Sequence, residues 1–249
     1  MKKLYRFSAI ALLVLPLVFT SCSDYLDRDD DDNITEAGVF ARYEKVNGLV
    51  SDVSAAAKKA DRPLVFFEHF SNSAITDECE GTNVEGNITN NFNNGAWNPN
   101  SLPGSVGQYW EALYEGIRKA NLIIENVQKY NTPDNPQQDG DLRNRIGEMY
   151  FMRGYFHMLL LRMYGEAPYI DRVINAGDNM DFKKESVHSM VEKIVTDAQT
   201  AYGMVPNKYV KTSENFGRVD KGACLGLISF VRWVAATPLW NGASQYGYN

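Results

Sequence analysis

The sequence predicts an all-α protein made of packed helical pairs, with one long irregular loop segment. Beyond residue 35, apolar side chains recur mostly at steps of three and four, which is the spacing of a helix rather than of a strand. Residues 63–107 break this periodicity and are rich in Asn, Gly, Ser and Thr. We therefore expect a helical domain over residues 36–249 with the irregular segment inside it.

The first 21 residues have the features of a signal peptide. Three basic residues, Lys2, Lys3 and Arg6, precede a mostly apolar run over 7–19, and small residues stand just before Cys22. This run is shorter than the roughly twenty apolar residues that a membrane-spanning helix needs. The segment is therefore expected to be removed on export.

Cys22 stands where the cleavage site is expected, in an arrangement that resembles the lipobox of bacterial lipoproteins. There the cysteine is acylated and becomes the mature N-terminus, so residues 1–21 would be a lipoprotein signal peptide. Phe19 departs from the leucine that is usual three residues before the cysteine. The alternative is a free cysteine beside a signal-peptidase site, which would leave a reactive thiol at an exported N-terminus. Acyl chains would anchor the domain to a bilayer without a membrane span.

Residues 22–35 are expected to form an acidic tether. Their dense aspartates repel one another, and the segment has too little apolar surface to fold alone. Aspartates also alternate here as in a calcium loop. However, Asp32 occupies the position of the turn glycine of an EF-hand, and Gly38 that of its bidentate glutamate. The sequence therefore favours a tether over a metal site.

Five helices are expected, each with an apolar stripe, at about 35–62, 108–130, 141–164, 186–202 and 220–238. Gly147 and Gly154 lie seven residues apart on the third helix, hence on nearly one face, where they would let a neighbouring helix approach closely. The fifth helix is apolar almost all round. Such a helix is usually buried on several sides, which implies partners, and few of them are obvious in the sequence. These patterns predict a tightly stacked bundle.

Composition and motifs narrow the possible functions. The formal net charge is −6, and removal of residues 1–21 takes away three positive charges and no acid, which gives −9. An acidic surface argues against nucleic acid, whose binding depends on Lys and Arg at phosphates. The sequence has no nucleophile elbow, Walker loop, dinucleotide fingerprint or metal-ligand spacing of its three histidines. We expect no enzyme, metal or cofactor, although two acids that meet in space remain possible as a glycosidase pair.

Four further residues have expected places in the fold. His157 lies mid-helix among apolar residues and is expected to be a core histidine, and Arg153 nearby is expected to pair with a carboxylate. Cys224 is expected to be a small buried hydrophobe, whereas Cys79 lies in a polar loop. Whether these two cysteines pair in an oxidising compartment stays open.

The irregular segment is where we look for a binding site, because long loops inside compact domains tend to be functional. Trp97 offers an aromatic plane beside the amides of Asn98 and Asn100. Sugars pack C–H faces on aromatic rings and pair their hydroxyls with amides, so this chemistry suits a carbohydrate. Alternatively, Trp97 packs the loop onto the helices. Asp77 and Glu78 are either a solvent-exposed loop-capping pair or further ligand contacts.

Five phrases in order along the chain resemble the SusD/RagB family of nutrient-binding outer-membrane lipoproteins of Bacteroidetes. They are Trp110-x-x-x-Tyr114-x-x-Ile117-x-x-Ala120-Asn121, Glu148-x-x-Phe151-x-Arg153-x-Tyr155, Tyr164-Gly165-Glu166-Ala167-Pro168, Gly217-Arg218-Val219 and Thr237-Pro238-Leu239-Trp240-Asn241-Gly242. The resemblance implies a scaffold of tetratricopeptide-like helical pairs and a protein without catalytic activity. In this family the domain caps a SusC-like TonB-dependent transporter barrel, binds oligosaccharide or sometimes peptide, and opens like a lid.

The resemblance also implies a location and an extent. The acidic row after Cys22 resembles the signal that sends Bacteroidetes lipoproteins to the outer face of the outer membrane. Trp97 and Asn100 occupy a segment where a family member could place a ring-stacking residue and an amide. Family members continue well past the Asn-Gly after the fifth helix, so the chain resembles an N-terminal portion, apparently truncated at its C-terminus.

The predicted function is therefore that of a cell-surface glycan-binding lipoprotein that works with a SusC-like transporter in oligosaccharide uptake. Three alternatives stay open on the sequence. The chain could be a helical-repeat scaffold lipoprotein that binds protein partners, a peptide-binding member of the same family, or a surface glycosidase.

Overall fold

A computed structural model describes residues 35–60, 74, 76–78, 93–96, 98, 100, 104–130, 136–210, 212 and 215–241. Within these ranges the regular structure is entirely helical, which confirms the all-α prediction. The helices are α3 (Glu36–Phe40), α4 (Tyr43–Ala60), α6 (Gly104–Tyr130), α7 (Pro136–Tyr164), α8 (Val187–Met204) and α9 (Lys221–Ala235). None of the described helices is both long and apolar enough to cross a membrane.

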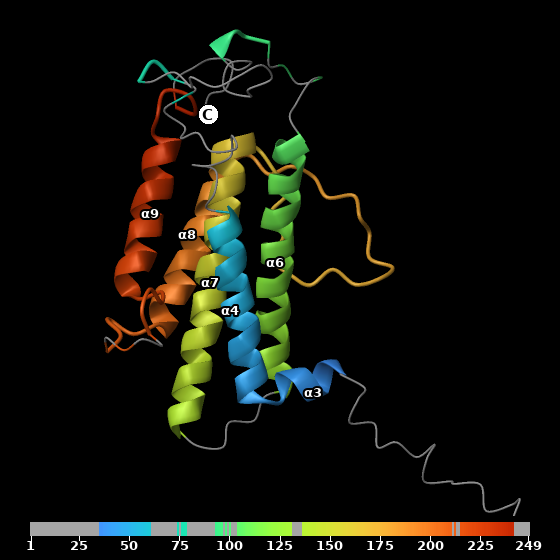
Figure 1. The fold of residues 1–249 in the computed structure, drawn as a ribbon, viewed down its shortest axis with the longest axis vertical. Coiled ribbons are helices and arrows are strands. Elements are labelled where there is room, and N and C mark those ends of the chain that lie inside the picture. The colour runs from blue at the N-terminus through green and yellow to red at the C-terminus, as the bar shows by residue number, and fades with distance from the viewer. Residues whose placement is uncertain are drawn as a thin grey trace, which may run out of the picture. The chain divides into compact units, whose positions relative to one another are not determined.

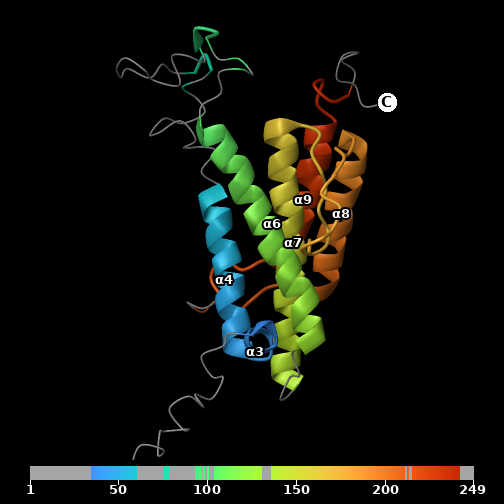
Figure 2. The same cartoon turned by 90° about the vertical axis from the view of Figure 1, so that its right-hand side faces the viewer.

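The chain divides into two units, residues 1–38 and 39–249, and the five long helices belong to the second. They lie side by side, with α7 in contact with all four others (Figures 1 and 2). On one side α4 packs against α6 and α7, and on the other α8 packs against α7 and α9. Consecutive helices α6, α7 and α8 pack as neighbours, as expected of helical pairs.

Some helix boundaries differ from those predicted. The first predicted helix is interrupted at Arg42, whose backbone N–H donates to the carbonyl of Val39 in a turn before α4 begins. The second begins at Gly104 and the third at Pro136, several residues earlier than expected. Proline is well placed in a first turn, because the N–H that it lacks would have no helical partner there.

Two glycines bring α7 and α8 close together, as predicted. A Cβ atom at Gly147 would lie 2.7 Å from the Cβ of Met204, and one at Gly154 would lie 3.3 Å from the Cβ of Asp197. Real Cβ atoms essentially never lie within 3.0 Å of another non-bonded heavy atom. A side chain at Gly147 would therefore push the two helices apart. The core is filled by large apolar side chains, among them Leu113, Met149, Phe156, Leu160, Met190 and Ile194.

A buried polar network joins α7 to α8 and to the segment after α7. Arg153 donates to both carboxylate oxygens of Asp197, at 2.8 and 2.5 Å, and to the side-chain carbonyl of Asn121 at 2.8 Å. Tyr169 donates to Asp197 at 2.7 Å. Burial acts to lower the pKa of Arg153, but the hydrogen bonds and charge of Asp197 outweigh it and raise that pKa. The predicted carboxylate partner of Arg153 is therefore Asp197.

His157 is a core histidine, as expected. Its Nε2 accepts from the backbone N–H of Ile170 at 3.0 Å, and its Nδ1 lies 2.8 Å from the carbonyl of Arg153. Nδ1 therefore carries the proton and donates to that carbonyl. Burial lowers the pKa of His157 to about 3, so the ring is neutral. It holds the chain after α7 against the helix.

Helix α9 is only partly covered within the described residues. Cys224, Leu227 and Val231 are buried on its inner face, and burial raises the pKa of the Cys224 thiol to about 11. On the outer face Leu225 is 54% exposed and Trp233 is 65% exposed. Within the described residues, the partners that an almost wholly apolar helix implies are therefore present on its inner face and missing from its outer face.

Candidate functional site

The acidic pair of the irregular segment lies at the surface. Asp77 and Glu78 are both exposed and form part of a bend. The backbone N–H of Glu78 donates to the hydroxyl of Thr76 at 3.3 Å, which is a local turn contact. Further along, the side-chain amide of Asn93 donates to the carbonyl of Ala74 at 3.0 Å and ties two parts of the segment together.

The predicted amides lie in one exposed turn. The side-chain carbonyl of Asn98 accepts from the backbone N–H of Asn100 at 3.0 Å, and its amide donates to the carbonyl of Ala96 at 3.4 Å. Asn98 thus shapes the turn that displays Asn100. Trp97, Cys79 and Cys22 lie outside the described residues. The structure brings Asn98 and Asn100 together.

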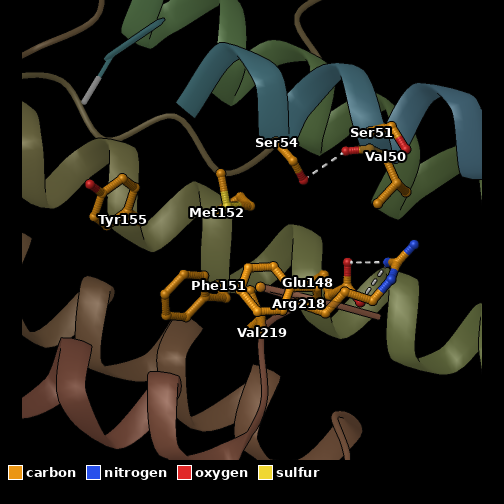
Figure 3. Close-up of a pocket in the computed structure, with 11 residues that line it drawn as sticks. Val50, Ser51, Ser54, Glu148, Phe151, Met152, Tyr155, Arg218 and Val219 are labelled. Carbon is orange, nitrogen blue, oxygen red and sulfur yellow. Dashed lines mark hydrogen bonds and ion pairs between the residues drawn. The ribbon is translucent and has the colours of Figure 1, made fainter. Parts of the chain in front are cut away.

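A second candidate, which the sequence did not predict, is a groove of about 400 Å³ between α4 and α7. Figure 3 shows Ser51 and Ser54 of α4 on one side of it and Phe151 and Tyr155 of α7 on the other. Residues 216–219, which precede α9, close one end. The groove therefore joins three segments that are far apart in the sequence.

The polar end of the groove is organised by Glu148. This carboxylate is 3% exposed and accepts hydrogen bonds from Arg145 at 2.8 Å, from Arg218 at 3.0 and 2.9 Å, and from Tyr209 at 3.0 Å. Arg145 also donates to Asn47 of α4 at 2.7 Å. Burial and the Glu148 charge raise the pKa of the Tyr209 hydroxyl, which therefore stays protonated and remains a donor. We call these four residues, Arg145, Glu148, Tyr209 and Arg218, the Glu148 hub.

Because Tyr209 and Arg218 both donate to Glu148, this carboxylate anchors the loop before α9. A group of His, Cys, Asp and Glu side chains suited to a metal ion is absent from the described residues. Its hydrogen bonds make the Glu148 hub a structural anchor between α7 and the loop before α9.

The remaining walls of the groove are aromatic or carry hydroxyls. The rings of Phe151 and Tyr155 are nearly parallel, 7° apart, with centroids separated by 6.1 Å. Phe216 stands at the edge and is 90% exposed. Ser51 and Ser54 donate to carbonyls one turn back in α4, at 2.9 and 3.0 Å, so their oxygens can still accept. This combination suits a ligand with apolar faces and hydroxyl edges.

Sequence reasoning missed the groove although several of its residues stand in recognised phrases. Phe151 and Tyr155 are four residues apart on α7, a spacing that places both on one face of a helix. Nothing in the sequence indicates that Ser51 or Phe216 lies opposite them. The available signal was Phe216 itself, a large apolar residue directly before a glycine in a polar loop.

Comparison with known proteins identifies the family. Residues 24–231 match the SusD-like family profile described as starch-binding and associating with the outer membrane. The chain belongs to the SusD-like family. SusD-like protein P2 of Formosa agariphila is 28% identical over 129 residues, which are 51% of this chain and 24% of that protein.

Solved structures of SusD-like proteins share the fold. A SusD homolog from Bacteroides thetaiotaomicron superposes with a TM-score of 0.58 at 22% identity, covering 81% of this chain and 38% of that one. A laminarin-binding SusD-like protein superposes with a TM-score of 0.61 at 21% identity, covering 83% and 46%. The chain thus spans about a quarter of the curated relative and less than half of these solved chains.

Proposed function

We propose that this chain is a cell-surface glycan-binding lipoprotein that works with a SusC-like TonB-dependent transporter in oligosaccharide uptake. The observation that carries the proposal is the family match over residues 24–231, whose description combines starch binding with association at the outer membrane. The laminarin-binding relative of the same fold supports a glycan as the ligand. At 21% identity, the laminarin specificity of that relative cannot be assigned to this chain.

The proposal places the protein on the outer membrane, facing outside. Residues 1–21 would be removed, Cys22 would carry the lipid, and residues 22–35 would form the tether to the domain over 36–249. Two acyl chains give stable attachment, since each buried methylene contributes about 0.8 kcal/mol. The tether would give the domain room to move as a lid over the transporter.

In the loop over residues 95–100, Trp97 and Asn100 are the residues proposed to contact the glycan. Asn98 acts through the turn, because its side chain is hydrogen-bonded to Ala96 and Asn100. Asp77 and Glu78 are solvent-exposed and are proposed to pair with hydroxyls of the glycan at the edge of the binding site. The proposed activity is binding without catalysis and without a cofactor.

The test is affinity electrophoresis of the folded chain through gels that contain amylose, laminarin or xylan. We expect one of these glycans to retard the wild-type chain, and Trp97→Ala to weaken binding roughly tenfold, equivalent to about 1.4 kcal/mol. Asn175→Ala, in a different exposed loop, is the matched control and should bind as wild type. Retardation by none of the glycans, or equal retardation of Trp97→Ala, would count against the proposed function or the proposed loop, respectively.

One observation favours a second candidate, a scaffold that binds protein or peptide partners. Beside the groove lies an apolar hollow of about 280 Å³ between α7 and α9, lined by Met158, Leu227 and Phe230 among others. Such a lining suits an apolar side chain better than a sugar hydroxyl. Co-purification from outer membranes separates the two candidates. A large TonB-dependent barrel together with glycan binding supports the first, and a barrel-free complex without glycan binding supports the second.

A further inference from the structure

Phe216 is exposed and yet held in place. It lies in a turn in which the backbone N–H of Arg218 donates to the carbonyl of Asn215 at 3.4 Å, and Gly217 next to it has a φ of +76°. Arg218 is fixed by its two hydrogen bonds to the buried Glu148. A large aromatic ring normally gains free energy from burial, so an anchored ring with 90% exposure is a candidate ligand contact.

The α4 wall of the groove supplies hydroxyls. Ser51 and Ser54 are three residues apart on α4 and therefore point from one face of that helix into the groove. Both are exposed, and both oxygens retain acceptor capacity. Figure 3 shows Ser54 across the groove from Met152 and Tyr155 of α7. A bound molecule would thus meet an aromatic surface on one side and hydroxyls on the other.

The size and charge of the groove favour a neutral ring-shaped ligand. Its volume of about 400 Å³ lies at the lower end of the range for small-molecule sites, and the adjoining hollow shares Phe151 and Tyr155 with it. Among the described residues that line it, the one carboxylate, Glu148, accepts hydrogen bonds from Arg145, Tyr209 and Arg218, so its charge is already paired with protein groups. None of the described residues of the 95–100 loop lines it.

We propose that this groove is a second glycan-binding site, in which Phe216 stacks on a sugar ring and Ser51 and Ser54 pair with its hydroxyls. The inference rests on the proposed function and adds a site to it. An oligosaccharide would be held at two places, in the 95–100 loop and in the groove. The Glu148 hub would position Phe216 without touching the sugar.

The experiment is calorimetric titration of the full chain with maltohexaose, laminarihexaose and xylohexaose. We expect Phe216→Ala to lower affinity for the bound glycan at least fivefold without changing the Tm, because the ring makes little contact with the fold. Ser54→Leu, which fills the groove from an exposed helical position, should lower it as much. Trp233→Ala removes another exposed aromatic residue, one that does not line the groove, and should bind as wild type.

The outcomes separate the two proposals. If the wild-type chain binds a hexaose, and Trp97→Ala weakens binding while Phe216→Ala and Ser54→Leu do not, the groove site is overturned and the proposed function stands. If the wild-type chain binds none of the three, both are overturned. Equal losses in Phe216→Ala and Trp233→Ala would also overturn the groove site, because the effect would then belong to exposed aromatic residues in general.

Discussion

Asp197 is the residue whose removal should cost the fold most. It is 5% exposed and pairs with the buried Arg153 and with Tyr169. Removing one partner of a buried ion pair lowers the free energy of unfolding strongly, because the remaining guanidinium of Arg153 would be buried and charged without its carboxylate. An ion pair at the surface contributes little to stability, since water and salt screen it.

We therefore expect Asp197→Ala to lower the free energy of unfolding by about 3–5 kcal/mol, as measured by urea denaturation. The matched control is Glu115→Ala. It breaks the exposed Glu115–Lys119 pair, whose atoms are 2.6 Å apart but whose side chains are 64% and 42% exposed. That variant should lose no more than about 0.5 kcal/mol. Similar losses in the two variants would show that the buried network is not what joins α7 to α8.

His157 should make stability depend on pH. In the folded chain its pKa is lowered to about 3, whereas an unfolded histidine titrates near about 6.5. Between these values the unfolded state binds the extra proton, so stability is fully present above about pH 6.5 and falls as the pH drops toward 3. The expected slope from this group is roughly 1.4 kcal/mol per pH unit.

The check is urea denaturation at pH 7.0, 6.0 and 5.0 of the wild type and of His157→Gln. This window lies mostly above the titration of carboxylates, so the difference in slope reports the histidine. We expect the wild type to lose stability across the window and the variant to lose much less. Parallel curves would mean that the buried ring is not held neutral.

At the scale of helices, the α7–α8 contact depends on the missing side chain at Gly147. Alanine there would improve helix propensity by about 1 kcal/mol, but its Cβ would lie 2.7 Å from that of Met204. Overpacking of this kind costs about 1–3 kcal/mol, so Gly147→Ala should be destabilising on balance. Thermal unfolding followed by circular dichroism gives the sign directly.

Gly226 of α9 is the control for this prediction. A Cβ atom there would meet nothing within 4 Å, so Gly226→Ala should keep the propensity gain and leave the Tm unchanged or raise it by a few degrees. If Gly147→Ala were also neutral or stabilising, the close approach of the two helices would not be a constraint on the fold.

The helices could be predicted because the spacing of apolar residues along each one indicates which of its faces is buried. The apolar stripe of α7 and its two spaced glycines indicated both a buried face and a close neighbour. The break at Arg42 was not predictable, since neither glycine nor proline marks it. The early start of α7 was not predicted, because its apolar stripe begins only at Leu142.

The candidate sites divide in the same way. The 95–100 loop was noticed because an aromatic residue and two amides are adjacent in the sequence. The groove was not, because Ser54, Phe151 and Phe216 meet only once α4, α7 and the loop before α9 have packed together. The spacing of these residues along the chain does not indicate that they line one groove. The Glu148 hub is hidden for the same reason, since Arg218 lies 70 residues from its partner.

For the whole molecule, the fold and the family are consistent with one task. Helices α4, α6, α8 and α9 pack against α7, and the exposed features lie on loops: Asn100 in its turn and Phe216 before α9. Rigid elements that display loop residues are the usual arrangement of binding proteins. Our central proposal is that these exposed features serve glycan capture at the cell surface.

The most direct test of that claim is a two-dimensional amide NMR titration of the chain with the hexaose it binds best. We predict saturable shifts confined to two regions, residues 95–100 and the groove around Ser54, Phe151 and Phe216, with the signals of the α7–α8 core unmoved. The absence of saturable shifts with malto-, laminari- and xylo-hexaose at millimolar concentration would contradict the account.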